Sequence, residues 1–551
     1  MQLVIAEKPS VARNIAKVLH ATNVKDGYLE GKEYLVSWCI GHLIELASAD
    51  QYRDDWKAWK YETLPMIPEN WKYQIKESTK GQFRVLKELL HRADITEVIC
   101  ATDAGREGEL IFRLVYNQAE CKLPFKRLWI SSMEEKAILE GFQQLKDGHE
   151  YDDLYYSAVA RSEADWLVGI NATRLFTVLY HHRLIVGRVQ TPTLAMLVER
   201  EKSIENFQKE KYYLVHLLMD GLDAVSSRIK EKSAAVQMME DMKDETAQIL
   251  SVKKEKKKVQ PPKLYDLTTL QREANRLLGF TAQQTLDYTQ SLYEKKLVTY
   301  PRTDARVLST AVAKEIYKNI SGLRNYQQAG AAAAEVLGME SWKNIAKTRY
   351  VNDKQITDHY AIIPTGQGLN ALGSVSLTAQ RVYETIVRRF LCIFYPPAVY
   401  QKVSLVTKLD GESFFSSFKV LKEEGYLKIA TNSFARKKAS DSEKGSNGEE
   451  EEVSCDTVLL EALQKLKKGD ILPVNGLSIK EGETSPPKRY NSGSMILAME
   501  NAGQLIEDEE LRAQIKGSGI GTSATRAEIL KKLFNIKYLA LNKKTQVITP
   551  T

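Results

Sequence analysis

Three acidic residues stand where their side chains could bind a divalent cation together. Glu7 and Asp103 each follow a short apolar run of the kind that forms a buried strand. Ligand sites in parallel α/β sheets lie at the carboxyl ends of the strands, so these two carboxylates should converge. Glu107 lies one turn into the next helix and can point back to them, whereas Glu109 must face elsewhere.

This set of acids has two interpretations. Oxygen-bearing groups on rigid elements, completed by water and phosphate, describe a Mg²⁺ site. Acidic residues are also favoured at helix starts by the helix macrodipole, without any ligand. The acids alone leave both interpretations open.

Two strand–turn–helix units must position these acids. Gln2–Ala6 is an apolar run followed by Pro9 at a plausible first helical position, with apolar residues at helical spacing beyond it. Glu97–Thr102 is a second apolar run, again followed by a helical pattern. The two units predict a parallel α/β sheet over roughly residues 1–150.

The middle of the chain is predicted to contain long helices and one crossing between domains. Residues 150–200 show few turn signals and predict mostly helix. The lysine-rich stretch Lys253–Lys258 is closed by Pro261 and Pro262. We interpret it as a linker into another domain.

A helix-turn-helix pattern follows this crossing. Leu267–Leu277 has helical spacing, Gly279 is a turn residue, and a second helix is predicted over about Thr281–Lys295. The extended segment Leu297–Pro301 comes next. Helix, turn, helix and strand in this order predict a winged helix, which is a common nucleic-acid scaffold.

A weaker copy of this pattern ends the sequence. Thr522–Phe534 is predicted to be helical, and Tyr538–Leu541 with Gln546–Thr549 could form a hairpin. Between the two modules, Ser433–Glu452 is rich in Ser, Gly and Lys and includes four consecutive glutamates. We expect a mobile surface loop there.

The composition is that of a globular multidomain protein. At a loose prior of ~150 residues per domain, 551 residues predict three or four domains and exclude a single small binding module. Hydrophobic residues make up 43% and charged residues 27%, which excludes a disordered chain. A net charge of +7 suits a polyanionic partner but is not specific for one.

Several classes of protein are excluded by missing patterns. The five cysteines contain no C-x-x-C pair, so neither a disulfide framework nor a zinc ribbon is expected. No apolar run approaches the ~20 residues of a membrane span, and a cytoplasmic location is expected. The sequence has no G-x-x-x-x-G-K-[ST] element, which argues against a P-loop motor.

Two motifs near the N-terminus resemble a known family. Ala6-Glu-Lys-Pro-Ser10 and Thr102-Asp-Ala-Gly-Arg-Glu-Gly-Glu109 are similar to the toprim domain of type IA DNA topoisomerases, and the compact N-terminus is most similar to the bacterial topoisomerase III branch. Further segments agree in the family's order: Arg161–Trp166, Val186–Thr193, Leu297–Asp304, His359–Thr365 and Gly519–Arg526. Matches spread over the whole chain are more specific than any one motif.

The resemblance assigns the nucleophile to Tyr300. In the family, a tyrosine in a Tyr-Pro-Arg element attacks a phosphodiester of single-stranded DNA and leaves a 5′-phosphotyrosyl link and a free 3′-hydroxyl. A phenol has a pKa of about 10, so it needs a nearby base or cations that stabilise the phenolate. Arg302 fits that need, because it lies on the same side of an extended segment and can hold phosphate oxygens bidentately.

Other roles are also implied by the resemblance. Lys8 is similar to a lysine that binds the scissile phosphate and helps protonate the leaving 3′-oxygen, and Glu7 is the general acid–base candidate. His359 is expected to contact a phosphate near Tyr300, although a lone histidine is more often a core residue. The remaining expected DNA contacts are Arg161, Arg174, Arg188, Gln190, Thr193, Gly519 and Gly521.

Two of these assignments have ordinary alternatives. Each arginine alone is as well explained as a solvated surface charge. Gly519 and Gly521 could let backbone N–H groups approach a phosphate. A turn at the start of a helix, with Thr522 as its cap, explains these glycines almost as well.

The implied protein is a monomeric, Mg²⁺-dependent and ATP-independent enzyme that relaxes negatively supercoiled DNA and decatenates DNA. Its fold class is multidomain α/β plus α+β, with a toprim domain, winged-helix domains and a β-rich arch arranged as a toroid. The expected domains are toprim (1–150), a helical DNA-groove domain (151–210 and 480–551), the arch (211–262 and 366–479) and a winged-helix domain with Tyr300 (263–365). A primase or nuclease on the toprim chemistry, or a non-catalytic DNA-binding scaffold, are the rivals.

One position departs from the family. The usual acidic triplet reads Asp-x-Asp-x-Glu, but the middle position here is Gly105, which leaves Asp103 and Glu107. Mg²⁺ is often bound by one or two carboxylates plus substrate phosphate. The sequence therefore predicts one weak Mg²⁺ site formed by Glu7 and Asp103, with Glu107 close by.

Overall fold

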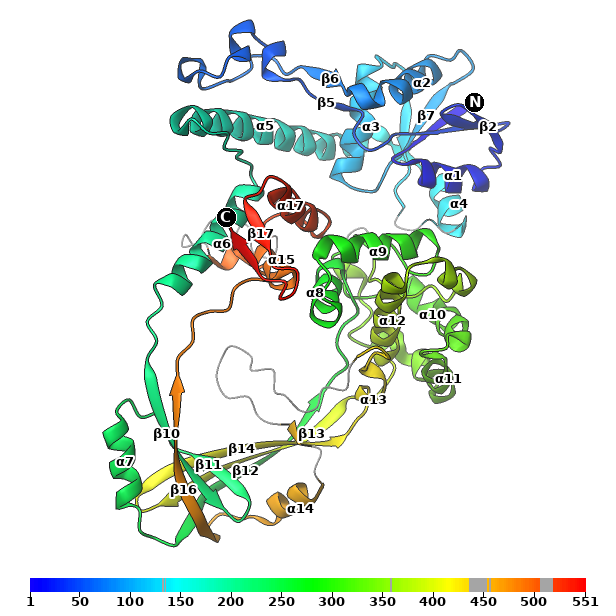
Figure 1. Cartoon of the computed structure of the whole chain (residues 1–551). Coiled ribbons are helices and arrows are strands. Elements are labelled where there is room, and N and C mark those ends of the chain that lie inside the picture. Colours follow the sequence, from blue (N-terminus) through cyan, green and yellow to red (C-terminus); the bar gives the residue numbers. More distant parts are fainter. Residues whose placement is uncertain (131–132, 134, 357–358, 436–452, 455–456, 506–518) are drawn as a thin grey trace. The chain divides into compact units, whose positions relative to one another are not determined.

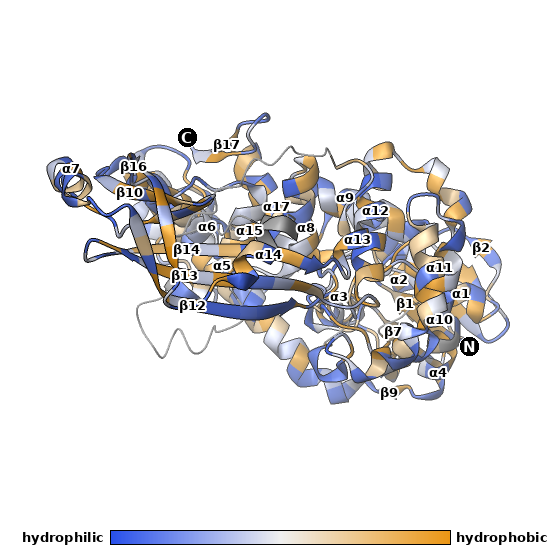
Figure 2. Ribbon diagram, turned by 90° about the horizontal axis from the view of Figure 1, so that it is seen from below, coloured by the Kyte–Doolittle hydropathy of each residue, from blue (hydrophilic) through white to orange (hydrophobic). Residues whose placement is uncertain are grey.

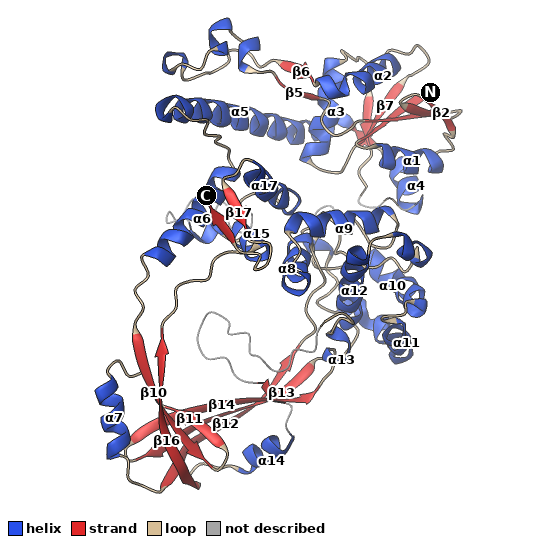
Figure 3. Cartoon of the chain, in the orientation of Figure 1, coloured by secondary structure: helices blue, strands red, loops and turns tan. Residues whose placement is uncertain are grey.

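A computed structural model describes residues 1–551 except 131–132, 134, 357–358, 436–452, 455–456 and 506–518 (Figure 1). The chain divides into two compact units, Met1–Pro192 and Thr193–Thr551. Helices and strands alternate in the first unit, whereas in the second unit most strands gather in one sheet and the helices α8 to α12 gather together (Figure 3). Each unit is described below by itself.

The first unit is built on a seven-stranded sheet in the order β2-β3-β4-β1-β7-β8-β9. Its four central strands are parallel: β4 (Tyr34–Trp38), β1 (Gln2–Ala6), β7 (Glu97–Ala101) and β8 (Phe125–Arg127). The outer strands are antiparallel: β2 (Asn23–Lys25), β3 (Tyr28–Glu30) and β9 (Lys146–Asp147). The predicted parallel α/β sheet is therefore confirmed.

Helices cover both faces of this sheet, which explains why β1 and β7 consist mostly of buried apolar residues. Leu3 and Ile5 of β1 pack in one core with α2 and α3, whereas Val4 and Ala6 pack in a second core with α1 and α4. Pro9 begins α1, as its fixed φ favours. The helices are α1 (Pro9–Val18), α2 (Lys80–Leu90), α3 (Arg106–Gln118), α4 (Glu135–Gln143) and α5 (Asp152–Tyr180).

An excursion from this sheet packs against α5. It includes a two-stranded sheet of β5 (Ile44–Leu46) and β6 (Tyr73–Ile75). Trp56 and Met66 of the intervening segment are buried with Trp166 of α5. The prediction of helix over 150–200 is confirmed by α5 and by α6 (Gln190–Glu205), with a break between them.

The second unit contains a seven-stranded sheet in the order β11-β10-β16-β12-β13-β14-β15. All its neighbours are antiparallel except β14 and β15. The strands are β10 (Lys211–Met219), β11 (Leu222–Val225), β12 (Thr246–Val259), β13 (Ala398–Leu409), β14 (Glu412–Glu423), β15 (Val453–Ser454) and β16 (Ile471–Glu483). Helix α7 (Lys232–Asp241) connects β11 to β12, and helix α14 (Thr457–Lys465) connects β15 to β16.

The prediction that Lys253–Lys258 is a linker is wrong. This stretch is the second half of β12 and pairs with β13 from Lys253 opposite Ser404 to Lys258 opposite Val399. Ladder hydrogen bonds use only the backbone, so exposed lysines do not prevent strand formation. The crossing begins one residue after the strand ends, at Gln260, and includes Pro261 and Pro262.

The predicted helix-turn-helix is confirmed. Its helices are α8 (Leu267–Leu278) and α9 (Ala282–Glu294). Gly279 ends α8 in the left-handed conformation with φ of 68°, and Thr281 opens α9 in a reciprocal capping box with Gln284. Packed with them are α10 (Thr310–Gly322), α11 (Gly330–Met339), α12 (Leu377–Cys392), α13 (Leu427–Ala430) and α15 (Ser492–Glu500).

The predicted strand Leu297–Pro301 is wrong, although the segment is held by its backbone. Only Val298 forms a bridge, and its partner is Pro364. Prolines lack the N–H that would extend the ladder on either chain, so pairing stops after one bridge. Thr299 N still donates to Ile363 O at 3.0 Å.

The helix and hairpin predicted near the C-terminus, as a weaker copy of the winged-helix pattern, are confirmed. Helix α17 (Ser523–Asn535) precedes an antiparallel pair of β17 (Leu539–Leu541) and β18 (Ile548–Pro550). Most of the stretch predicted to be a mobile loop, residues 436–452, lies outside the described residues. In the described part of the chain, no helix is both long enough and apolar enough to cross a membrane.

Candidate active site

Glu7, Lys8 and Asp103 meet at the carboxyl ends of β1 and β7. Asp103 N donates to Glu7 Oε2 at 3.3 Å. Lys8 Nζ lies 3.7 Å from Glu7 Oε1 and 3.9 Å from Asp103 Oδ2. Because β1 and β7 are parallel neighbours, Ala6 pairs with Ala101 and the residues beyond them leave the sheet at the same edge. The structure thus brings together the two carboxylates that the strand-end argument paired.

The environment of Glu7 disfavours a negative charge. Burial raises the pKa of Glu7 most, the charge of Asp103 raises it further, and Lys8 opposes both. Two carboxylates that repel each other at a partly buried edge, with one lysine to balance them, leave a position where a divalent cation would be stabilised. The donor set of Glu7 and Asp103 therefore fits Mg²⁺ held in part by a substrate phosphate.

Glu107 has different neighbours. His42 Nε2 lies 2.7 Å from Glu107 Oε1, and Arg161 of α5 bonds Glu107 Oε2. The hydrogen bond from His42 and the charge of Arg161 hold the pKa of Glu107 below its usual value. Among the described residues, no group of three or more His, Cys, Asp or Glu side chains is arranged to hold a metal ion. The role of Glu107 as a ligand stays a prediction.

His42 was not found from the sequence, although the same rule would have found it. It follows β4, which is the other parallel neighbour of β1, and Trp38 at the end of β4 pairs with Ala6. The loop after β4 therefore leaves the sheet beside Glu7. Applying the strand-end rule to three strands instead of two would have included His42.

A buried ion-pair network lies behind the acids. Glu109 is fully buried and faces away from Glu107, with Oε1 2.8 Å from Arg113 Nε and Oε2 3.0 Å from Arg127 Nε. Arg127, also fully buried, donates to Thr102 O at 2.8 Å and to Asp103 O at 2.7 Å. This guanidinium fixes the backbone from which the Asp103 side chain projects. The sequence analysis missed it, and its signal was a cation within a short strand.

The polar residues expected on the DNA groove of the first unit differ in exposure. Arg188 forms a two-point ion pair with Asp165 of α5 and keeps half of its side chain exposed. Arg174 is buried, and its Nη1 donates to Trp56 O at 2.5 Å. Gln190 is buried and donates to Ile185 O at 3.3 Å. Arg188 is therefore accessible to a ligand, whereas Arg174 and Gln190 hold backbone.

In the second unit, the glycine motif forms a tight turn at the start of α17. Gly519 and Gly521 have φ of 65° and 67°. A Cβ on Gly519 would lie 2.4 Å from Glu500 O, so no other residue fits there. Thr522 caps α17, with its N–H donating to Thr525 Oγ1 at 3.0 Å. The helix-start interpretation therefore accounts for the glycines, and contact with a phosphate stays a prediction.

Arg526 and Thr193 are two further buried polar residues of the second unit. Arg526 donates to Ile520 O and to Gly521 O, both at 3.1 Å, and burial lowers its pKa. It was part of the quoted motif but was not predicted as a site residue. Thr193 of α6 is fully buried.

Tyr300 lies in a segment with a fixed backbone. Its ring is 4.3 Å from the ring of His359 and 5.4 Å from that of Tyr293, between centroids. Thr303 Oγ1 donates to His359 O at 2.7 Å, which ties the two segments together. Arg302 is exposed. The structure therefore brings His359 to Tyr300 and leaves the Arg302 side chain at the surface.

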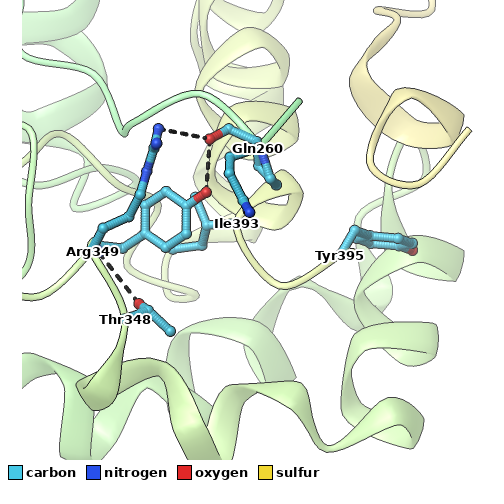
Figure 4. Close-up of a pocket in the computed structure, with 7 residues that line it drawn as sticks. Gln260, Thr348, Arg349, Ile393 and Tyr395 are labelled. Atoms are coloured by element: carbon cyan, nitrogen blue, oxygen red, sulfur yellow. Dashed lines mark hydrogen bonds between the residues drawn. The ribbon is translucent and has the colours of Figure 1, made fainter. Parts of the chain in front are cut away.

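One cavity in the second unit is separate from this arrangement. It has a volume of about 400 Å³ and lies where the chain leaves β12, lined by residues that include Gln260, Arg349 and Tyr395 (Figure 4). Tyr350 Oη donates to Pro261 O at 2.7 Å. None of the expected site residues lines this cavity. Its contacts anchor the crossing between the sheet and the helices of the second unit.

Comparisons with known proteins agree on one family. A family model described as "DNA topoisomerase" matches residues 149–551, and the Toprim domain model matches residues 2–133. DNA topoisomerase 3 of Bacillus licheniformis is 41% identical over 544 residues, which cover 97% of this chain and 72% of that protein. DNA topoisomerase 3 of Bacillus subtilis is 40% identical over 546 residues, with the same shares covered.

A solved structure is similar in fold. Full-length topoisomerase I from Thermotoga maritima matches with a TM-score of 0.66 and 23% sequence identity. The match covers 100% of this chain and 80% of that one. The likeness extends the agreement from motifs to the fold of the whole chain.

Proposed function

The chain belongs to the type IA DNA topoisomerase family, and from that premise we propose that Tyr300 cuts one strand of DNA. The Tyr300 oxygen attacks the phosphorus of a phosphodiester, the bond from phosphorus to the 3′-oxygen breaks, and the 3′-oxygen leaves as a hydroxyl. Religation is the reverse attack of that hydroxyl on the phosphotyrosine. The link preserves the phosphodiester energy, so no ATP is needed.

The observation that carries this proposal is the contact of Tyr300 with His359 in a backbone held by Thr299 and Thr303. A nucleophile needs a fixed line of approach, and these contacts set one. Arg302 is exposed beside it and can hold the non-bridging oxygens of a phosphate as their charge grows. His359 would contact the same phosphate.

Glu7, Lys8 and Asp103 at the carboxyl ends of β1 and β7 are called here the acid edge. This edge would supply the proton to the leaving 3′-oxygen. The raised pKa of Glu7 makes this carboxyl easier to protonate than an ordinary glutamate, as proton exchange with the substrate requires, and Lys8 adds a positive charge for the phosphate. We assign the general acid–base role to Glu7 and phosphate binding to Lys8. Arg127 has a positioning role, because it holds the backbone at Asp103.

Magnesium would be held by Glu7 and Asp103, with Glu107 close by. When bound, it supplies positive charge to the phosphate oxygens. Because Gly105 provides no carboxylate, a single weak site is proposed whose occupancy rises when DNA is bound. Calorimetric titration of Mg²⁺ with and without an oligonucleotide tests this, and two tight sites in the free protein would refute it.

The substrate proposed is single-stranded DNA within negatively supercoiled or catenated DNA. Its strand would follow the partly buried Arg161 and the exposed Arg188. Arg174, Gln190, Thr193, Gly519 and Gly521 are proposed to support this groove through the backbone they hold or shape. Relaxation and decatenation are the net activities, carried out by a monomer in the cytoplasm, where the DNA of bacterial relatives such as those of Bacillus is found.

The four-domain toroid is likewise a proposal. It combines the toprim domain (1–150), the groove domain (151–210 and 480–551), the arch (211–262 and 366–479) and the winged-helix domain (263–365). The confirmed elements α8, α9 and α17 support the two winged-helix assignments. The seven-stranded, mostly antiparallel sheet of the second unit supports the assignment of the arch.

A covalent adduct is the decisive test. The protein is incubated with a 5′-labelled and a 3′-labelled single-stranded oligonucleotide and Mg²⁺, and is then denatured. A 5′-phosphotyrosyl link leaves the 3′ label on the protein and releases the 5′-labelled fragment. A primase or a nuclease on the same toprim chemistry would leave no label on the protein, and neither would a non-catalytic scaffold.

A further inference from the structure

The lysine-rich half of β12 forms part of an ordered basic surface. In the sheet, Lys253 pairs with Ser404, and Lys257 pairs with Tyr400. One strand further, Lys402 of β13 pairs with Lys419 of β14. Directly paired residues of antiparallel strands project from the same face, and residues two apart on a strand share it. Lys253, Lys257, Lys402 and Lys419 therefore share one face, called here the lysine face.

The opposite face of the same strands is used for packing. Lys254 Nζ donates to Gln464 O at 2.6 Å and to Leu466 O at 2.8 Å. Val403 and Val420 project from that side into a core with Leu463 of α14. The two faces thus differ in what covers them, although both are lined by lysines of β12.

The lysine face carries four lysines, Lys253, Lys257, Lys402 and Lys419, at the paired positions of three neighbouring strands. Glu255 is the acid on this face, and it pairs with Lys253 at 2.6 Å. Lys402 and Lys419 stand directly opposite each other, an arrangement of like charges that costs stability. β12 is hydrophilic along most of its length (Figure 2). An anionic ligand across these strands would be attracted by this concentration of positive charge.

We propose that the lysine face binds the phosphate backbone of duplex DNA. Lysines are point charges that bind phosphates without reading the sequence. The four steps from Lys253 to Lys257 span about 13 Å at ~3.3 Å per residue, over which a duplex presents about eight charges, roughly half of them on one side. The face can therefore meet three or four phosphates at once.

Single-stranded DNA fits this face less well. Surfaces that bind single strands combine cations with rows of aromatic side chains on which bases stack. Here the ring of Tyr400 is covered by Lys419 Nζ at 4.8 Å. Phe415, 49% exposed, lies on the same face of β14, four residues before Lys419. The face offers cations without a row of stacking platforms, which favours the duplex.

The proposal rests on the proposed function only in that the ligand is DNA. A topoisomerase that cuts a single-stranded region also meets the duplex that flanks it. A second contact, on residues far in sequence from Tyr300, would hold that duplex without taking part in the cleavage reaction.

Two matched double variants test the proposal. Lys253→Gln with Lys257→Gln removes two charges from the lysine face, and Lys256→Gln with Lys258→Gln removes two charges from the other face of the same strand. Binding of a 20-base-pair duplex is measured between 50 and 200 mM salt. At ~0.9 in the log–log slope per phosphate, the first variant should shrink the salt effect on affinity about twelvefold relative to the parent, and the second should leave it unchanged.

Three outcomes would overturn the proposal. Equal effects of the two variants would indicate general electrostatics, and no effect of either would indicate a surface that serves solubility. An equal loss for a single-stranded oligonucleotide would assign the face to single strands. Adduct formation on a short single-stranded oligonucleotide should stay at the parental rate in both variants, and its absence in the parent would refute the proposed function instead.

Chemical footprinting gives a readout that needs no variant. Lysines of the parent are acetylated with and without duplex and are quantified by mass spectrometry. Duplex should protect Lys253, Lys257, Lys402 and Lys419 and leave Lys258 reactive. Uniform protection of all lysines of β12 would contradict the proposal.

Discussion

The acid edge around Glu7 and the segment around Tyr300 are organised in different ways. The acid edge is held by charged side chains. Lys8 forms ion pairs with Glu7 and Asp103, and Arg127 donates a hydrogen bond to the backbone at Asp103. Around Tyr300 the backbone is held by hydroxyl and carbonyl groups, and Arg302 remains exposed. In the acid edge the charged groups are fixed before substrate binds, whereas in the Tyr300 segment the backbone is fixed.

The difference matters for catalysis. Fixed charges stabilise a transition state without reorganisation, but they must be balanced within the protein when no substrate is bound. The acid edge achieves that balance with ion pairs. The tyrosine segment instead fixes the direction of attack and leaves its cation for the substrate phosphate.

Tyr300→Phe should give the largest effect, because it removes the reacting oxygen and little else. We expect loss of the covalent adduct and of relaxation, with single-strand affinity close to that of the parent. Tyr293→Phe is the matched control, since its ring touches Tyr300 and it should retain cleavage. Full relaxation by the Tyr300 variant would refute the assignment.

Glu109→Gln tests whether the acid edge depends on its buried charges. The change leaves Arg127 buried without its carboxylate partner, and breaking a buried pair in this way costs about 3–5 kcal/mol. Glu107→Gln, at a half-exposed pair, should cost under about 1 kcal/mol. Urea unfolding followed by tryptophan fluorescence measures both, and equal losses would show that the buried pair contributes no more to stability than the half-exposed pair.

Arg302→Ala should lower the cleavage rate by roughly 10²–10³, as loss of one donor to a developing oxyanion does. The free energy of unfolding should barely change, because the side chain is exposed. Arg302→Lys should recover part of the rate, since lysine keeps the positive charge but cannot bind two phosphate oxygens bidentately as the guanidinium does. If binding and cleavage fall by equal factors, Arg302 is a ground-state contact instead.

The smallest expected effect is on thermal stability. The Tm values of Glu7→Gln and Glu107→Gln are compared with that of the parent across pH, in EDTA. The pKa of Glu7 is raised above its ordinary value of 4.5, so its ionisation destabilises the folded state at neutral pH. Glu7→Gln should therefore raise the Tm at pH 7, and the gain should vanish as the pH falls below 4.5. Glu107 has a lowered pKa, so Glu107→Gln should lower the Tm at pH 7 and converge with the parent in acid.

Shifts of the same sign for the two variants would show that the two carboxylates share one environment. The opposite signs follow from burial and Asp103 at Glu7, and from His42 and Arg161 at Glu107. The difference in Tm between parent and variant, followed across pH, is the measurement.

Local sequence determined the elements that carry the site. The apolar runs before Glu7 and Asp103 predicted β1 and β7, and Gly279 with Thr281 predicted the turn between α8 and α9. These signals succeed because they depend on near neighbours: a buried parallel strand must be apolar, and a left-handed turn favours glycine. The motifs likewise identified the family, because catalytic residues keep their type and spacing.

Contacts between distant segments were decided only by the tertiary structure. The sequence showed a lysine run, and only pairing with β13 made it a strand with two different faces. His42 joined Glu107, and Arg127 joined Asp103, across gaps of 65 and 24 residues. A charge or hydrogen bond acts through space, so its partner depends on which strands become neighbours, and no local pattern records that.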